Sequence, residues 1–289
     1  MISVIIPAHN EANVIGRCLR SMLDGCCAGE LEIVVACNGC TDETAKIAQA
    51  FGEAVRVIEV PAASKVAALN AGDRAAQGFP RFYVDADVVL PLHAIREVAR
   101  VLTEGQFLAA APRMDVDLRG RKWLVRAFYR VWLRVPYHRR GMIGSGVYAL
   151  SEAGRRRFDH FPEIIADDGY IRSLFTDGER AMVDSVAFTI FPPATFWGLI
   201  KIKTRARLGF YEWRVRYPEL AGTERRSAGS SFRELLRQPR LWPYVPVYAL
   251  VNLITRLRAR RQFAAGQLKL WERDDSARTA PAHDLRRAM

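Results

Sequence analysis

Cysteine is missing from most of this 289-residue chain. All five cysteines (Cys18, Cys26, Cys27, Cys37 and Cys40) lie before residue 41. An odd number, with two of them adjacent, is not the even and dispersed set on which a secreted disulfide-rich domain depends. The sequence therefore predicts a protein of a reducing compartment.

Long hydrophobic runs are missing as well. The longest, Leu241 to Ile254, contains Pro243 and Pro246, and it is shorter than the ~20 residues that a membrane-spanning helix needs. The N-terminal MISVIIPAHNEA has neither the basic segment nor the cleavage site of a secretory signal. We therefore expect a cytoplasmic protein, with arginines around the apolar run favouring peripheral seating on the inner face of the membrane over spanning.

Acidic residues are in the minority, 31 against 43 basic ones, and the formal net charge is +12. Such an excess attracts polyanions: a membrane surface, a phosphorylated substrate or nucleic acid. A solvated arginine-rich surface explains the excess equally well. No nucleic-acid partner is expected, because no recognised binding motif occurs and acidic pairs suit a phosphate-binding groove poorly.

What the chain does contain is an alternation of short apolar runs and helical patterns. Strands are predicted at 3–6, 31–36, 55–60, 82–84 and 107–111, and helices after the first strand, at 41–51 and at 65–77. Strands and helices that alternate with short links are typical of an α/β fold with a mostly parallel, Rossmann-like sheet. Ligands of such sheets bind at the carboxyl ends of the strands.

Two carboxylates follow the fourth predicted strand. Asp85 and Asp87 stand one residue apart, so on an extended segment they project to one side. Buried together they would repel each other unless a cation neutralised them, and Mg²⁺ or Mn²⁺ suits such oxygen ligands. The second Asp-x-Asp pair, Asp115 and Asp117, is predicted to be structural because it lies outside the alternating region.

Five motifs, VIIPAHNEA, VVACNGCTDET, SKVAALNAG, YVDAD and ADDGY, follow one another along the chain. In this order they resemble family 2 glycosyltransferases over roughly residues 1–200. The resemblance implies a GT-A fold and inverting, metal-dependent transfer of one sugar. The donor would be a nucleotide-diphospho-sugar, with a UDP-sugar favoured, and the acceptor a hydroxyl of a glycan or lipid-linked precursor.

The resemblance also implies a nucleotide pocket. Pro7, His9 and Glu11 would line the base pocket, with His9 where an aromatic ring commonly stacks on the base. Asn38 stands where the family usually has Asp, but its carbonyl oxygen can still accept a hydrogen bond. Beside the donor would lie Asn70 and Lys65, the latter offsetting diphosphate charge.

The reacting groups are implied in the same way. Asp85 resembles the ribose- or metal-side carboxylate, Asp87 the direct metal ligand and Asp168 the catalytic base. Repulsion from Asp167 would raise the pKa of that base. By itself, Asp167-Asp168-Gly169 is more typical of a turn that begins a helix.

The pair Cys37 and Cys40 brackets Asn-Gly between a strand and a helix. A thioredoxin-like redox pair is one interpretation, because that motif also lies at a helix start. No second cysteine pair or nearby histidine completes a zinc site of usual spacing. A turn beside the base pocket is the favoured interpretation.

The resemblance divides the chain into three parts: a nucleotide-sugar half at 1–100, an acceptor and catalytic half of the same domain at 101–200, and a basic and apolar helical extension at 201–289. The Gln-x-x-Arg-Trp motif of processive members is absent from KIKTRARLG at 201–209, which favours transfer of a single sugar. A nucleotidyltransferase on a similar sheet and a non-catalytic nucleotide- or nucleic-acid-binding protein are the alternatives.

A further helix is predicted where basic residues recur every four positions around aromatic ones, at Lys122, Arg126, Arg130 and Arg134. Its aromatic face suits either a membrane interface or the protein core.

Overall fold

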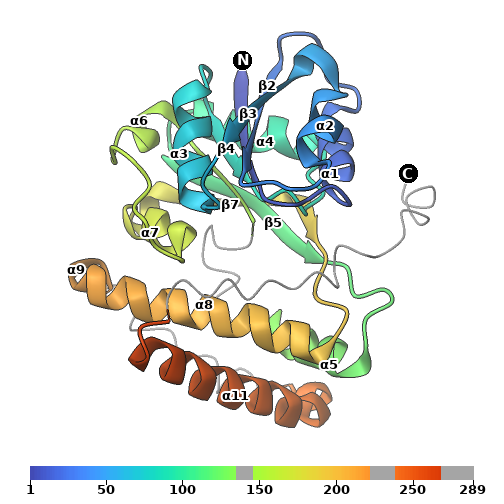
Figure 1. Cartoon of the computed structure of the whole chain (residues 1–289), viewed down its shortest axis with the longest axis vertical. Coiled ribbons are helices and arrows are strands. Elements are labelled where there is room, and N and C mark those ends of the chain that lie inside the picture. Colours follow the sequence, from blue (N-terminus) through green and yellow to red (C-terminus); the bar gives the residue numbers. More distant parts are fainter. Residues whose placement is uncertain (135–145, 222–237, 268–289) are drawn as a thin grey trace.

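The computed structural model describes residues 1–134, 146–221 and 238–267 (Figure 1). The strands are β1 (Ile2–Ala8), β2 (Leu31–Asn38), β3 (Val55–Val60), β4 (Arg81–Val84), β5 (Ala109–Val116), β6 (Val147–Leu150) and β7 (Arg180–Ile190). The α-helices are α1 (Ile15–Leu23), α2 (Thr44–Gln49), α3 (Lys65–Ala75), α4 (Leu92–Thr103), α5 (Trp123–Trp132), α6 (Glu152–Arg155), α7 (Asp167–Ser173), α8 (Phe196–Arg216), α9 (Pro218–Ala221) and α11 (Val245–Ala264). Short 3-10 helices are η1 (Gly52–Ala54), η3 (Asp177–Glu179) and η5 (Pro239–Tyr244).

All seven strands form one sheet in the order β3-β2-β1-β4-β6-β5-β7. The first four strands are mutually parallel, β6 is antiparallel to both of its neighbours, and β5 and β7 are parallel. The prediction of a mostly parallel α/β sheet is confirmed. Because β1 to β4 are parallel, the turns that follow them meet at one edge of the sheet.

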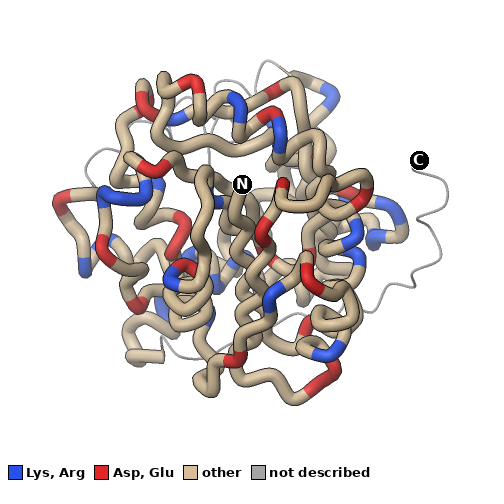
Figure 2. Tube along the Cα trace, turned by 90° about the horizontal axis from the view of Figure 1, so that it is seen from above, with Lys and Arg blue, Asp and Glu red and all other residues tan. Residues whose placement is uncertain are grey.

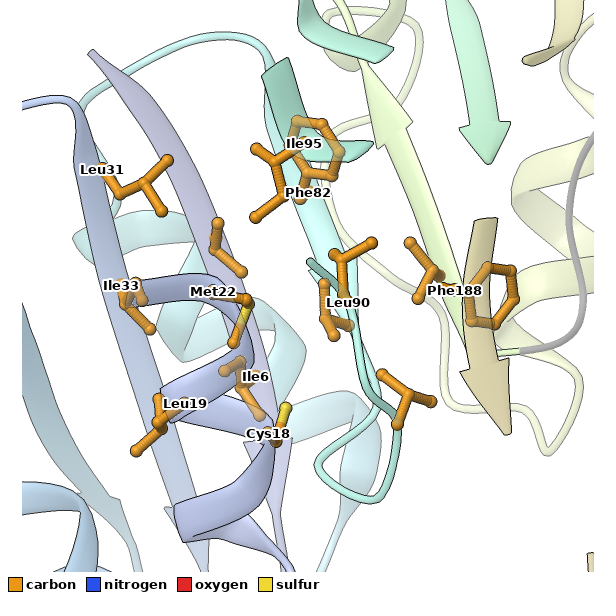
Figure 3. Close-up of a cluster of buried hydrophobic side chains, with 14 of the residues drawn as sticks. Ile6, Cys18, Leu19, Met22, Leu31, Ile33, Phe82, Leu90, Ile95 and Phe188 are labelled. Carbon is orange, nitrogen blue, oxygen red and sulfur yellow. The ribbon is translucent and has the colours of Figure 1, made fainter. Parts of the chain in front are cut away.

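Both faces of the sheet are buried, which explains why its central strands are continuous apolar runs. Ile6 on β1 and Ile33 on β2 contribute to one cluster, which α1 covers with Cys18, Leu19 and Met22 (Figure 3). Alternate residues such as Ile5 and Val34 belong to the cluster on the other face. The period of two along each strand thus distributes the side chains between two cores.

Side-chain hydrogen bonds move two predicted helix boundaries. The helix predicted at 41–51 begins only at Thr44, because Asn10 Oδ1 accepts the Thr41 N–H at 2.8 Å and Asp42 Oδ1 accepts the Thr44 N–H at 3.0 Å. The helix predicted to reach residue 77 ends at Ala75, since the Gln77 N–H donates to Glu32 Oε2 at 2.8 Å. The contacts from Asn10 to Thr41 and from Glu32 to Gln77 join residues far apart in the sequence, so local patterns cannot reveal them.

A separate layer of helices lies on one side of the sheet, where α5, α8 and α11 pack together (Figure 1). Phe128 and Tyr129 of α5 are buried there, and Phe128 stacks on Tyr248 with ring centroids 5.3 Å apart, whereas Trp123 at the start of the helix is 58% exposed. Its basic residues at 122, 126, 130 and 134 are exposed. The core-packed interpretation of this helix is therefore correct. Within the described ranges, no helix is long and apolar enough to cross a membrane.

Figure 2 shows the charges of the chain from above. Basic and acidic positions alternate over the sheet domain in that view, and neither sign is gathered into a single stripe.

Candidate active site

The turns after β1 and β2 are joined by hydrogen bonds. His9 Nδ1 lies 2.6 Å from the Asn38 carbonyl oxygen, and because a carbonyl only accepts, this nitrogen carries the proton. The Asn38 side-chain amide in turn donates to the Ala8 carbonyl at 2.9 Å. Asn10, between them, has a φ of 52°, a left-handed conformation that Asn adopts more readily than most residues. Two of the predicted base-binding residues, His9 and Asn38, thus connect the turns after β1 and β2.

Cys37 lies near the end of β2, and Cys40 lies in the turn that follows it. Burial, and then the neighbouring Cys40, raises the pKa of the Cys37 thiol to about 12. Redox-active cysteines instead have lowered pKa values that favour the thiolate. Both thiols are free, and Cys40 Sγ lies 3.4 Å from the Ala8 carbonyl oxygen. These features favour the structural turn over the redox pair.

The Asp85–Asp87 segment is a turn, not the extended stretch that the sequence suggested. The hydrogen-bonded pairing of β4 with β6 ends where the Asp85 N–H donates to the Gly146 carbonyl at 2.8 Å. The chain then turns, and the Val88 N–H lies 3.4 Å from the Asp85 carbonyl oxygen. Arg17 supports the turn by donating to the Asp87 carbonyl at 3.2 Å. Strand alternation therefore does not determine how the two carboxylates are oriented.

Lys65 connects the end of β4 to α7. It is the first residue of α3, which Ser64 caps by accepting the Ala67 N–H at 3.2 Å. Its Nζ lies 3.0 Å from Asp85 Oδ1 and 3.3 Å from Asp167 Oδ2. Burial alone lowers the pKa of a lysine, but attraction by Asp167, Asp85 and Asp168 outweighs it and holds the pKa of Lys65 above its ordinary value. The ammonium group thus neutralises carboxylates from two separate elements.

Asp167 and Asp168 begin α7, so they do form the helix-starting turn that the sequence allowed. They also face the pocket. Asp167 is only 4% exposed. Burial, and then repulsion from Asp167, raises the pKa of Asp168 to about 6, although Lys65 opposes the shift. A carboxylate with such a pKa can both exist as a base and accept a proton near neutral pH.

Asn70, which is predicted to lie beside the donor, binds the protein backbone with its side chain. Its side-chain amide donates to the Phe161 carbonyl at 3.0 Å, and its Oδ1 accepts the Phe161 N–H at 2.8 Å. Both ends of the side chain therefore bind the backbone of the segment that leads into α7. In this structure Asn70 positions that segment.

One pocket collects several of these groups at the carboxyl edge of the sheet. Four of the predicted site residues line this pocket: Pro7, Lys65, Asp85 and Asp168. His9, Glu11, Asn38, Asn70 and Asp87 do not line it. The pocket also contains Asp167 and Tyr148. Tyr148 was not predicted as a site residue, since the strand GVYAL carries no local sign of chemistry.

The carboxylates at the end of β4 fit a divalent cation whose coordination is shared with a substrate. Among the described residues, no group of three His, Cys, Asp or Glu side chains could hold a metal ion alone. Mg²⁺ is usually bound by only one or two carboxylates together with substrate phosphates, so Asp85 and Asp87 are the candidate donors. Asp85 is open to such a ligand, because its side chain is 40% exposed.

Comparison with known proteins now identifies the chain. The sequence profile described as Glycosyl transferase family 2 matches residues 3–160. The chain belongs to glycosyl transferase family 2. The family to which the five motifs pointed is therefore confirmed. Glycosyltransferase AglD of Haloferax volcanii is 29% identical over 154 residues, which are 46% of this chain and 25% of that protein. The chain thus spans about a quarter of the length of this curated relative.

Solved structures show that this family 2 glycosyltransferase has the GT-A fold. Mannosyltransferase PcManGT from Pyrobaculum calidifontis, in complex with GDP-Man and Mn²⁺, has a TM-score of 0.61 and 21% identity, with 92% of this chain and 79% of that chain covered. Residues 1–349 of S. aureus TarS, in complex with UDP-GlcNAc, give a TM-score of 0.54 and 15% identity, with 92% of both chains covered. At these identities the likeness concerns the fold alone.

Proposed function

We propose that this glycosyltransferase moves one sugar, with inversion, from a nucleotide-diphospho-sugar to an acceptor hydroxyl, and that Asp168 is the base. The observation that carries the proposal is the pocket in which Asp168, with a pKa raised to about 6, shares walls with Asp85 and Lys65. A single displacement needs a base on one side of the sugar and a charge-stabilising site on the other. Asp168 would be the base, and Asp85 would belong to the site that stabilises charge.

Asp168 would begin the reaction by removing the proton of the acceptor hydroxyl. The acceptor oxygen attacks the anomeric carbon, the bond from that carbon to the phosphate oxygen breaks, and the electron pair leaves with the nucleoside diphosphate. A base with a pKa of about 6 is mostly ionised at pH 7, yet still basic enough to hold the proton as the new bond forms.

The negative charge on the leaving diphosphate would be neutralised by Lys65 and by a divalent cation. When bound at Asp85 and Asp87, the cation would act as a Lewis acid for the phosphate oxygens. Lys65, which neutralises Asp85 and Asp167 in this structure, is close enough to the same site to pair with the diphosphate instead. The nucleobase of the donor would be bound by His9, Asn38 and the Pro7–Glu11 turn.

A binding experiment can identify the nucleobase of the sugar donor. PcManGT was solved with GDP-Man and Mn²⁺, and TarS with UDP-GlcNAc. We favour a UDP-sugar. Thermal-shift measurements with UDP, GDP, ADP and CDP, each with and without Mn²⁺, should show one diphosphate that raises Tm by about 5 °C or more at 100-fold excess over its Kd, and only with the metal. If every nucleotide leaves Tm unchanged, the proposed donor site is wrong.

We further propose that the enzyme lies on an anionic membrane surface through α11, where a lipid-linked acceptor would be found. Three leucines on one side of this helix, Leu250, Leu253 and Leu257, are about half exposed, at 49%, 56% and 47%. Their spacing of three and four residues places them on one face. The opposite face, with Val251 and Ala259, is buried.

Charge complementarity favours a lipid surface as the occupant of this face. Arg256, Arg260 and Arg261 are exposed on the last turns of the same helix. An apolar stripe that continues into arginines matches the acyl chains and phosphate groups of an anionic bilayer. Trp242, 55% exposed just before α11, is a residue type enriched at membrane interfaces.

Vesicle sedimentation tests this attachment. The protein should bind phosphatidylglycerol vesicles, bind them more weakly at high salt, and ignore phosphatidylcholine vesicles. A Leu253→Glu/Leu257→Glu variant should bind at least about tenfold more weakly, because two apolar side chains no longer leave water. Val215→Glu is the matched control, since Val215 is an apolar residue of α8 that is 67% exposed. If the leucine variant instead changes the oligomeric state with vesicle binding unaltered, a second copy of the chain covers the face.

A further inference from the structure

Tyr148, on β6, is one of the residues that line the pocket. It is 5% exposed, and its ring stacks on Tyr83 of the neighbouring strand with centroids 4.9 Å apart and an interplanar angle of 22°. The antiparallel register pairs the same two residues directly. The ring of Tyr148 therefore has a fixed position, and the residue lines the pocket together with Lys65, Asp85 and Asp168.

The hydroxyl of Tyr148 is buried and has no hydrogen-bond partner within the part of the chain that the structure describes. Its stacking partner is different: the Tyr83 hydroxyl donates to Asp73 Oδ1 at 2.6 Å. Asp73 also accepts from Arg81 at 2.9 Å, so that buried network is complete without Tyr148. Two paired tyrosines thus differ in one respect: only Tyr83 has its hydroxyl satisfied by the protein.

A buried unpaired hydroxyl is costly, because it has lost its water without gaining another partner. Phenylalanine would fill the same space and stack in the same way. The hydroxyl of Tyr148 is therefore best explained by a partner that is present only when the pocket is filled.

Electrostatics define what this hydroxyl can do. Burial, and then the negative charges that include Asp167, Asp168 and Asp85, raise the pKa of Tyr148 well above its ordinary value. It remains protonated at all working pH values, so it cannot serve as a base. It can donate one hydrogen bond and accept another.

We propose that Tyr148 is a specificity residue whose hydroxyl binds a hydroxyl group of the transferred sugar. The inference rests on the proposed function, because single displacement places the sugar between the diphosphate site at Asp85 and the base Asp168. Tyr148 lines the pocket that contains both residues. Lys65, which bridges Asp85 and Asp167 across this pocket, must turn towards the diphosphate for the sugar to enter. A sugar that lacks the matching hydroxyl leaves Tyr148 unpaired, and such a loss discriminates strongly between substrates.

The test compares Tyr148→Phe with wild type, using UDP and UDP-GlcNAc or GDP and GDP-mannose with Mn²⁺. The variant should bind the nucleoside diphosphate as wild type does, because this ligand has no sugar. Its kcat/KM with the intact donor should fall about 10- to 100-fold. Tm without ligand should be equal to or above that of wild type. Tyr129→Phe, which changes a buried tyrosine of α5 outside the pocket, is the control and should leave kcat/KM unaltered.

Donors that each lack one sugar hydroxyl separate the possible outcomes. Wild type should discriminate against one of them, and Tyr148→Phe should use that donor and the intact donor equally well. The ratio is measured within each protein, so a loss of folded protein cancels. If the variant and wild type give the same ratio for every donor, the hydroxyl touches only a buried water and the inference is overturned. If wild type neither binds nor uses any nucleotide-sugar, the proposed function fails and the role of Tyr148 fails with it.

Discussion

Asp168→Asn should lower kcat by about 10³-fold, while the protein remains folded and binds the donor nucleotide as before. The substitution keeps the shape of the side chain but removes the group that takes the acceptor proton. Steady-state kinetics and nucleotide binding, measured on the same preparation, separate loss of catalysis from loss of binding. Asp159→Asn is the matched control, because the Asp159 side chain is 97% exposed.

The pH dependence of sugar transfer provides a second test of Asp168 as the base. Since burial and Asp167 raise the pKa of Asp168 to about 6 in the free protein, kcat/KM of wild type should fall as the pH is lowered through about 6. The residual activity of Asp168→Asn should not show this fall at low pH. If the variant transfers sugar at the wild-type rate, another group is the base and our assignment is wrong.

Stability should change in the opposite direction to activity. The folded pKa of Asp168, about 6, lies above the ordinary value of 3.8, so the ionised carboxylate destabilises the fold at neutral pH. Asp168→Asn should therefore raise the free energy of unfolding at pH 7 by up to about 3 kcal/mol. The gain should decrease as the pH falls through 6 and vanish below about pH 4, where the wild-type carboxyl is protonated in both states.

Asp87→Asn should abolish the stabilisation that Mn²⁺ and the nucleoside diphosphate together confer, and should lower kcat/KM by about 100-fold or more. Asparagine keeps one oxygen but loses the negative charge that a hard divalent cation prefers. Thermal-shift and kinetic measurements over a range of Mn²⁺ concentrations check the effect, which excess metal should partly reverse.

The second Asp-x-Asp pair provides the control for this experiment. Asp115 lies near the end of β5 and pairs with Arg113 at 2.6 Å on the surface. Asp115→Asn removes the same charge from the same local motif, and we expect no change in Mn²⁺ dependence. Equal losses in both variants would mean that general charge, and not coordination at Asp87, explains the effect.

Several features of the site followed from the sequence. The apolar runs that became β1 to β4 place Pro7, Asp85 and the segment before Lys65 at one edge of the sheet, because parallel strands end together. The acidic pair at 167–168 was recognised by its resemblance to a family motif. In the structure Asp168 reaches the same pocket.

Other features could not be recognised in this way. Nothing local to Asn70 indicates that both ends of its side chain bind Phe161. Equally, the apolar strand around Tyr148 gives no sign that one hydroxyl on it lacks a partner. The turn at Asp85–Asp87 depends on where the ladder with β6 ends, which is a property of strand pairing.

The sequence by itself determined the first four strands with the helices between them, the family, and which carboxylates are the candidates for reaction, because periodicity and short motifs are properties of neighbouring residues. Only the tertiary structure decided that Lys65 pairs with both Asp85 and Asp167, and that Tyr148 lines the same pocket with a hydroxyl that has no partner among the described residues. The physical reason is that burial and charge at each of these groups come from elements far apart in the chain. Their pKa values and hydrogen bonds therefore exist only once the sheet has brought those elements together.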